Sequence, residues 1–77
     1  MIYCDLIDIK GDNARYWFSC GKGEKGIIAF PLKFVKPYEI EKQPDIEVAT
    51  MWINKLYAKY AEDFKNGVVN DKLSYEC

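Results

Sequence analysis

The chain has 77 residues, of which 49% are hydrophobic and 30% are charged, and its formal net charge is −1. This length supports one domain, residues 1–77, and the composition excludes a disordered chain. The near-neutral charge offers no general attraction to nucleic acid or to an anionic membrane. Because the sequence has neither a signal-like start nor an apolar run of roughly 20 residues, we expect a cytoplasmic protein without a membrane span.

The sequence contains three cysteines, Cys4, Cys20 and Cys77, and no histidine. Without histidine or a C-x-x-C pair, the usual zinc ligands are missing, and we expect no metal and no cofactor. In a cytoplasmic chain these thiols should be reduced and packed as small apolar groups.

Residues 2–20 predict a β-hairpin. Two runs rich in β-branched and aromatic side chains are separated by the turn sequence Gly-Asp-Asn at 11–13. If these three residues form the loop, Cys4 lies directly opposite Cys20.

The segment from Gly21 to Gly26 matches G-x-G-x-x-G, a pattern of loops that hold nucleotide phosphates. A dinucleotide fold needs a helix directly after this loop, whereas residues 27–30 favour a strand and Pro31 follows. Protein kinases place such a loop between two strands, but the H-R-D and D-F-G motifs of kinases are missing. We therefore interpret the glycine segment as a turn whose glycines adopt positive φ.

A third strand is predicted at 27–34, a short fourth strand at 38–41, and a last short strand at 73–77. Pro31 has no backbone N–H, so the third strand should lie at a sheet edge or break near this residue.

From about 46 to 66 the apolar residues recur at three- and four-residue steps, which is typical of a helix with one buried face. Asp45 is the expected N-cap, and Gly67 is the expected left-handed stop. The predicted fold is therefore α+β. An antiparallel sheet of three to five strands has one long helix, about 46–66, packed on one face.

The residues indicate no catalytic constellation, and we expect a protein that is not an enzyme. The commonest general base, histidine, is absent, and the hydroxyl side chains have no visible base to activate them. Asp5 and Asp8 are three residues apart in a strand, so they should lie on opposite faces of the sheet. Glu39 and Glu41 share a face but are typical of a solvated strand edge.

The predicted strands carry more apolar surface than one helix can cover. We expect the surplus to form an interface with another protein, or with a second copy in a homodimer. Strong twist, residues 31–44 and the C-terminal tail could instead cover this surface. The candidate interface residues are Tyr3, Ile7, Ile9, Trp17, Phe30, Met51 and Trp52.

An alternative function is a small domain that binds single-stranded nucleic acid, with bases stacked on an aromatic sheet face around Trp17. The charge balance disfavours it, because RNA-binding sheets normally surround their aromatic residues with basic side chains.

The order of several short stretches carries a resemblance: Met-Ile-Tyr at 1–3, Leu-Ile at 6–7, Gly26, Trp-Ile-Asn-Lys-Leu at 52–56 and Phe-Lys-Asn-Gly at 64–67. Over nearly the whole chain this order is similar to that of a group of small uncharacterised proteins from phages and mobile elements of Gram-positive bacteria. The resemblance implies a hairpin, one or two further strands, one long helix and a short tail. It also implies an accessory or inhibitor protein that acts on host enzymes or defence systems, as anti-CRISPR proteins do.

Overall fold

A computed structural model describes residues 1–33 and 37–76 of the chain, which form an α+β fold with a single antiparallel sheet. Within these residues there are five strands and two short helices. In chain order the elements are β1 (Ile2–Lys10), β2 (Asn13–Ser19), β3 (Gly26–Pro31), β4 (Glu39–Lys42), α1 (Thr50–Lys59), α2 (Ala61–Lys65) and β5 (Lys72–Tyr75).

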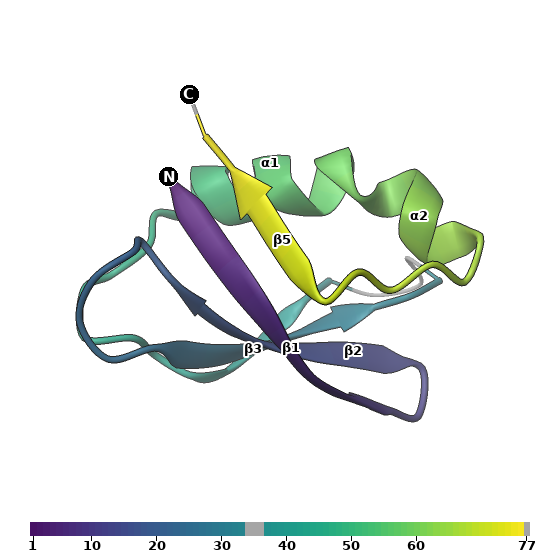
Figure 1. Ribbon diagram of the computed structural model, residues 1–77, viewed down its shortest axis with the longest axis horizontal. Helices are drawn as coiled ribbons and strands as arrows, with labels where there is room; N and C mark the ends of the chain where they lie inside the picture. The colour runs from purple at the N-terminus through teal and green to yellow at the C-terminus, as the bar shows by residue number, and fades with distance from the viewer. Residues whose placement is uncertain (34–36, 77) are drawn as a thin grey trace.

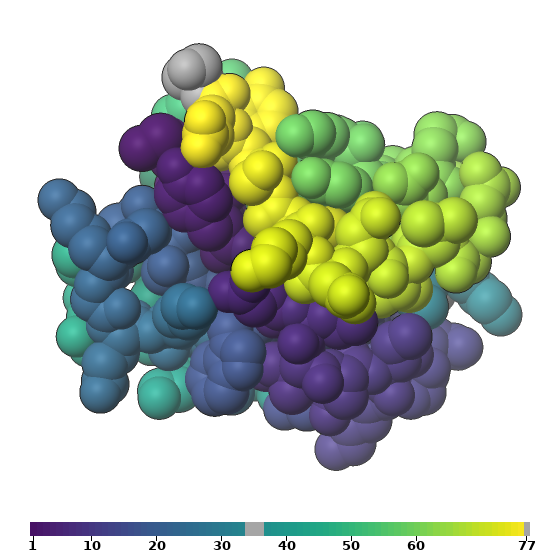
Figure 2. All heavy atoms as spheres, in the orientation of Figure 1, coloured from purple at the N-terminus to yellow at the C-terminus, as the bar shows by residue number. Residues whose placement is uncertain are grey.

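The strand order in the sheet is β4-β3-β2-β1-β5. The first four strands form a meander, and β5 returns after the helices to pair with β1. Both helices lie on the same side of the sheet (Figure 1). In the space-filling view the C-terminal strand, in yellow, fills the space between β1 and the helices (Figure 2). The sheet therefore has one covered face, called here the inner face, and one outer face.

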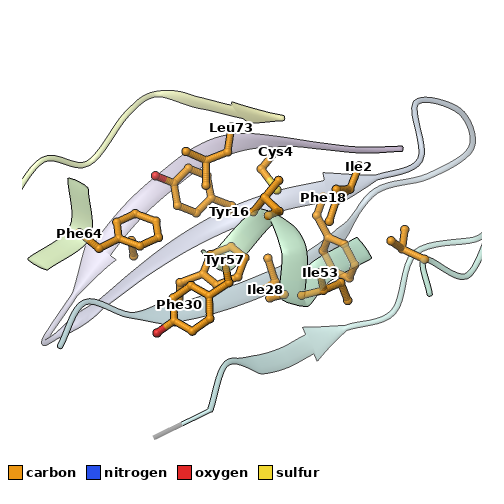
Figure 3. Packing of buried hydrophobic residues seen from close by; sticks show 13 residues of the cluster. Ile2, Cys4, Tyr16, Phe18, Ile28, Phe30, Ile53, Tyr57, Phe64 and Leu73 are labelled. Carbon is orange, nitrogen blue, oxygen red and sulfur yellow. The ribbon is translucent and has the colours of Figure 1, made fainter. Parts of the chain in front are cut away.

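The core lies between the inner face and the helices (Figure 3). Alternate strand residues supply it, as the pleat of a strand requires, and α1 and α2 contribute their apolar stripe. Burial of each large apolar side chain in this core contributes about 1.5–3 kcal/mol. The largest fully buried side chains are Tyr16, Phe18, Phe30, Phe64, Ile2, Ile28, Ile53, Leu56, Leu73 and Cys4.

The first hairpin is confirmed, but its predicted register is wrong. The loop has two residues, with Lys10 opposite Asn13, and a β-bulge at Ile7 adds a further shift. Cys4 therefore lies opposite Phe18 rather than Cys20, and both of these thiols are free. In the part of β1 that precedes the bulge, each residue pairs with a β2 residue two positions before the predicted one, as Cys4 does. A shift of two residues keeps each of these side chains on its predicted face.

The predicted single helix over 46–66 is also wrong. Residues 46–49 are not helical, α1 begins at Thr50, and Tyr60 separates α1 from α2. Asp45 is not an N-cap: its carboxylate accepts a hydrogen bond from the Glu24 N–H at 3.3 Å, and its own N–H donates to the Glu24 carbonyl at 3.0 Å. This residue holds the glycine loop instead of beginning a helix.

The helical stop at Gly67 is confirmed. Gly67 has a φ of 77° and donates its N–H to the Phe64 carbonyl, while the Val68 N–H donates to the Asp63 carbonyl. These two bonds form a Schellman motif, which satisfies the last helical carbonyls.

The remaining strands agree with the predicted ones to within a few residues. The third strand ends at Pro31 but lies between β2 and β4, so it is not an edge strand. The ends of the third and last predicted strands, at Phe34 and Cys77, lie outside the described residues. The glycine segment is a turn between β2 and β3, with positive φ at Gly21 and Gly23.

Gly26, the last glycine of this segment, is required by a close approach of the backbone. An added Cβ would press against the Lys42 carbonyl oxygen and would lie 2.7 Å from the Pro44 nitrogen. We expect Gly26→Ala to lower the free energy of unfolding by about 1–3 kcal/mol, as overpacking does. Chemical denaturation would measure this change. Gly11→Asn is the control, since an added Cβ at Gly11 meets nothing within 4 Å and Asn tolerates positive φ. Equal stability of Gly26→Ala and the wild type would contradict the expectation.

Candidate functional site: the outer face of the sheet

A cross-strand row that spans all five strands runs across the outer face of the sheet. Directly paired residues share a face, and successive pairs connect β5 to β4 through Trp17 at the centre of the sheet. The indole of Trp17 is 39% exposed, whereas its neighbours Tyr16 and Phe18 point into the core. The Trp17 row consists of Lys72, Asp5, Trp17, Ile27 and Lys42.

A second row, the Arg15 row, lies beside it and consists of Asp8, Arg15, Ala29 and Glu39. The Arg15 guanidinium donates to both carboxylate oxygens of Asp8, at 2.8 and 3.0 Å, and to Glu41 at 3.0–3.3 Å. Both acceptors lie at irregular positions of their strands, because Asp8 directly follows the bulge at Ile7 and Glu41 is the extra residue of a bulge in β4. The guanidinium thus joins β1, β2 and β4 across the outer face.

The Asp5 carboxylate accepts hydrogen bonds from two lysines, Lys72 of the Trp17 row and Lys25 of the glycine loop. Lys25, from the glycine loop, lies 2.9 Å from one carboxylate oxygen, and Lys72, from β5, lies 3.1 Å from the other. The hydrogen bonds from Lys25 and Lys72 lower the pKa of the Asp5 carboxyl. In the same way, the hydrogen bond from Arg15 lowers the pKa of Glu41.

The bulge at Ile7 overturns the prediction that Asp5 and Asp8 lie on opposite faces. Asp5 pairs with Trp17 and Asp8 pairs with Arg15, so both carboxylates are on the outer face. Each one is bound by different cations, and the two therefore do not form an acid–base pair.

An open pocket with a volume of about 430 Å³ lies over Trp17. Lys42 and the glycine-loop residues Glu24 and Lys25 complete its lining. Lys25 is bound to Asp5, whereas Lys42 has no acidic partner among the residues that the structure describes. The glycine segment therefore forms a wall of this pocket in addition to being a turn.

The seven candidate interface residues do not form one surface. Tyr3 and Trp17 are on the outer face, as predicted, and the Tyr3 hydroxyl donates to Glu76 at 2.7 Å. Ile7 is the bulge residue, and the bulge moves Ile9 to the inner face, opposite Ala14, although Ile9 stays half exposed near the hairpin tip.

The other three candidates lie elsewhere. Phe30 is fully buried and cannot be an interface residue, since its ring contacts those of Tyr16, Tyr38, Tyr57 and Phe64. Met51 is exposed on α1, and Trp52 is half-buried against Tyr75 with Lys55 over its ring. The sequence prediction also missed the charged residues of the outer face, because only the cross-strand pairing brings them to Trp17.

The two edges of the sheet offer little for another strand to bind. At the β5 edge, the Ser74 N–H donates to the Tyr60 hydroxyl at 3.2 Å, and the Ser74 carbonyl accepts from Lys59 at 2.9 Å. At the β4 edge, a bulge and charged side chains interrupt a strand of four residues. These are common ways in which proteins protect sheet edges.

Comparisons with protein families, with curated proteins and with solved structures found no match to this chain. In the described part of the chain, no helix is both long and apolar enough to cross a bilayer, and no group of three potential metal ligands comes together.

The ion pairs of Arg15 predict a loss of stability in acid. A carboxyl whose pKa is lowered by folding stabilises the folded state above its ordinary pKa, and this contribution disappears as the pH falls through the lowered value. For Glu41 the loss begins below the ordinary value of 4.5 and is at most about 1 kcal/mol for such an exposed pair. Thermal unfolding of the wild type and Arg15→Met between pH 6 and pH 2 should show less acid sensitivity in the variant. Lys22→Met is the control, since Lys22 is exposed and forms no ion pair within the described part of the chain. Equal pH dependence in all three proteins would contradict the expectation.

The different burial of Trp17 and Phe30 gives a second prediction. Phe30→Ala should lower the free energy of unfolding by about 3–5 kcal/mol, the cost of an aromatic residue removed from a core. Trp17→Ala should cost clearly less, because its ring is already 39% exposed on an uncovered face. Urea denaturation of both variants would measure the difference, and equal losses would show that Trp17 is a core residue.

Proposed function

We propose that the protein is a small binding module, not an enzyme, and that it recognises another protein through the outer face of its sheet. The observation that carries this proposal is the position of Trp17. Its exposed ring lies at the centre of the Trp17 row, on the outer face. The helices cover the other face of the sheet (Figure 1). Tryptophan is strongly enriched among the residues that dominate protein–protein binding energies, and these residues are typically central in the interface.

The composition of the outer face supports a protein partner. The expected broad apolar patch is replaced by the Trp17 ring with Ile27 and Ala29 beside it, Tyr3 further along the same face, and charged side chains around them. An apolar centre with a polar rim is the usual anatomy of a protein interface. Because both sheet edges are protected, we expect a partner to bind on the outer face rather than to add a strand to an edge of the sheet.

The same face gives the nucleic-acid alternative one favourable observation, because Lys25 and Lys42 line the pocket over Trp17. However, Glu24 lines this pocket too, and Asp5 binds Lys25. Phosphates would thus meet carboxylates at the place where bases would stack, and we favour protein over nucleic acid. The proposed origin in phages or mobile elements, with a host protein as partner, rests on the sequence resemblance alone.

Photo-crosslinking in a lysate of the source cells would test the proposed function. With Ile27 replaced by a photoreactive phenylalanine, we expect discrete crosslinked protein products, because Ile27 is the direct neighbour of Trp17 on the outer face. Introducing Trp17→Ala into this chain should remove them. The same photoreactive residue at the exposed Ala58 of α1 is the control for nonspecific capture.

Products that persist without the Trp17 ring, or that also form from position 58, would overturn the proposal. Crosslinks to nucleic acid, together with binding that weakens steeply with salt, would instead favour the alternative function.

A further inference from the structure

The charges of the outer face are arranged with a polarity along the strands. The Trp17 row together with Glu24 and Lys25 has one more positive than negative charge, whereas the Arg15 row with Glu41 has two more negative than positive charges. The charged residues of the first group are Asp5, Glu24, Lys25, Lys42 and Lys72, and those of the second group are Asp8, Arg15, Glu39 and Glu41. The face as a whole is close to neutral, so neither a purely acidic nor a purely basic partner is favoured.

Two charged groups on β4 are not used within the described part of the chain. Lys42, in the Trp17 row, and Glu39, in the Arg15 row, are both exposed, and neither forms an ion pair or a hydrogen bond through its side chain there. A partner that fits this face presents a carboxylate to Lys42 and an ammonium group to Glu39. Its negative side then lies against the Trp17 row and its positive side against the Arg15 row.

A second copy of the chain has this reversed polarity by symmetry. We propose, on the basis of the proposed function, that the outer faces of two copies pack together around a two-fold axis that runs across the strands between the two rows. This rotation puts the Trp17 row of each copy against the Arg15 row of the other. Two sheets packed face to face in this way keep their strands nearly aligned, as in β-sandwiches.

The symmetry fixes which side chains meet. Trp17 faces Arg15 of the second copy, so the planar guanidinium can stack on the indole while its edges stay bound to Asp8 and Glu41. Ile27 faces Ala29, and Lys42 faces Glu39, each contact being formed twice. Asp5 faces Asp8 of the second copy, but each of these carboxylates already has its own cations.

Charge reversal on β4 tests this arrangement. The wild-type protein should be dimeric by light scattering and sedimentation at micromolar concentration with reductant present. Lys42→Glu places two pairs of carboxylates against each other in the dimer, and Glu39→Lys places two pairs of ammonium groups against each other. We expect each variant alone to dimerise at least about tenfold more weakly than the wild type, from two lost pairs and the new repulsion.

The decisive sample is the mixture of the two variants. In a mixed dimer every β4 contact again joins opposite charges, so the mixture of Lys42→Glu and Glu39→Lys should dimerise more tightly than either variant alone. Trp17→Ala should be monomeric, and Lys55→Glu, which makes the same charge change on α1, should dimerise as the wild type does. Circular dichroism of each variant would verify that the fold is retained.

Three outcomes would overturn the proposal: a monomeric wild type, a dimer unaffected by Trp17→Ala, or a mixture that stays monomeric. Failure here is distinguishable from failure of the proposed function. A monomer that still crosslinks to a different protein through position 27 would leave the binding role intact and exclude only the second copy as partner.

Discussion

The contact of Phe30 with the aromatic rings around it determines the arrangement of the two layers. Its ring lies 5.0 Å from that of Tyr57 on α1 and 6.0 Å from that of Phe64 on α2, measured between centroids. It also meets Tyr16 from the neighbouring strand. Because aromatic rings supply much of the burial available to a chain of this size, both helices pack on the face from which Phe30 projects. The outer face remains without a helix for this reason.

On the outer face, which no helix covers, charged side chains connect the strands in place of apolar packing. Arg15 joins β1 to β4, and Asp5 joins the glycine loop to β5. Each exposed ion pair contributes little by itself. The pairs of Arg15 with Glu41 and of Asp5 with Lys25 and Lys72 nevertheless connect segments that are distant in sequence. This arrangement explains why the face carries few apolar side chains around Trp17. The side chains that would otherwise cover the sheet are paired carboxylates and cations, which also keep the face soluble when nothing is bound to it.

Much of the fold could be predicted from the sequence, and what could not be predicted has a common cause. The first hairpin, the glycine turn and the stop at Gly67 follow from local backbone preferences. The bulge at Ile7 does not, because it depends on the pairing of β1 with β2, and without it Ile9 and Asp8 are assigned to the wrong faces. The spacing of the apolar residues does not reveal the break between the helices at Tyr60. Hydrogen bonds of helical spacing, from Tyr60 to Leu56 and from Phe64 to Tyr60, continue across it, so the apolar residues keep the same period.

The candidate site was predicted only at its centre, Trp17, and not at its rim. The residues around the indole come from four separate strands and a loop, and no spacing along the chain reveals that Lys42 and Lys25 line the same pocket as Trp17. Phe30 was misplaced because a run of four apolar residues in β3 does not show which of them face the core.

The pairing of β5 with β1 has a consequence for how the chain folds. Tyr3 pairs with Ser74 across almost the whole length of the sequence, and the first and last strands, β1 and β5, lie side by side (Figure 1). The chain loses the conformational entropy of closing this long loop before the contact between β1 and β5 stabilises it, and such contacts slow folding. Until β5 arrives, β1 is an unprotected edge strand with its backbone groups free to pair with another chain. We therefore expect the late pairing of the last strand to slow folding and to lengthen the period during which the chain is prone to aggregate.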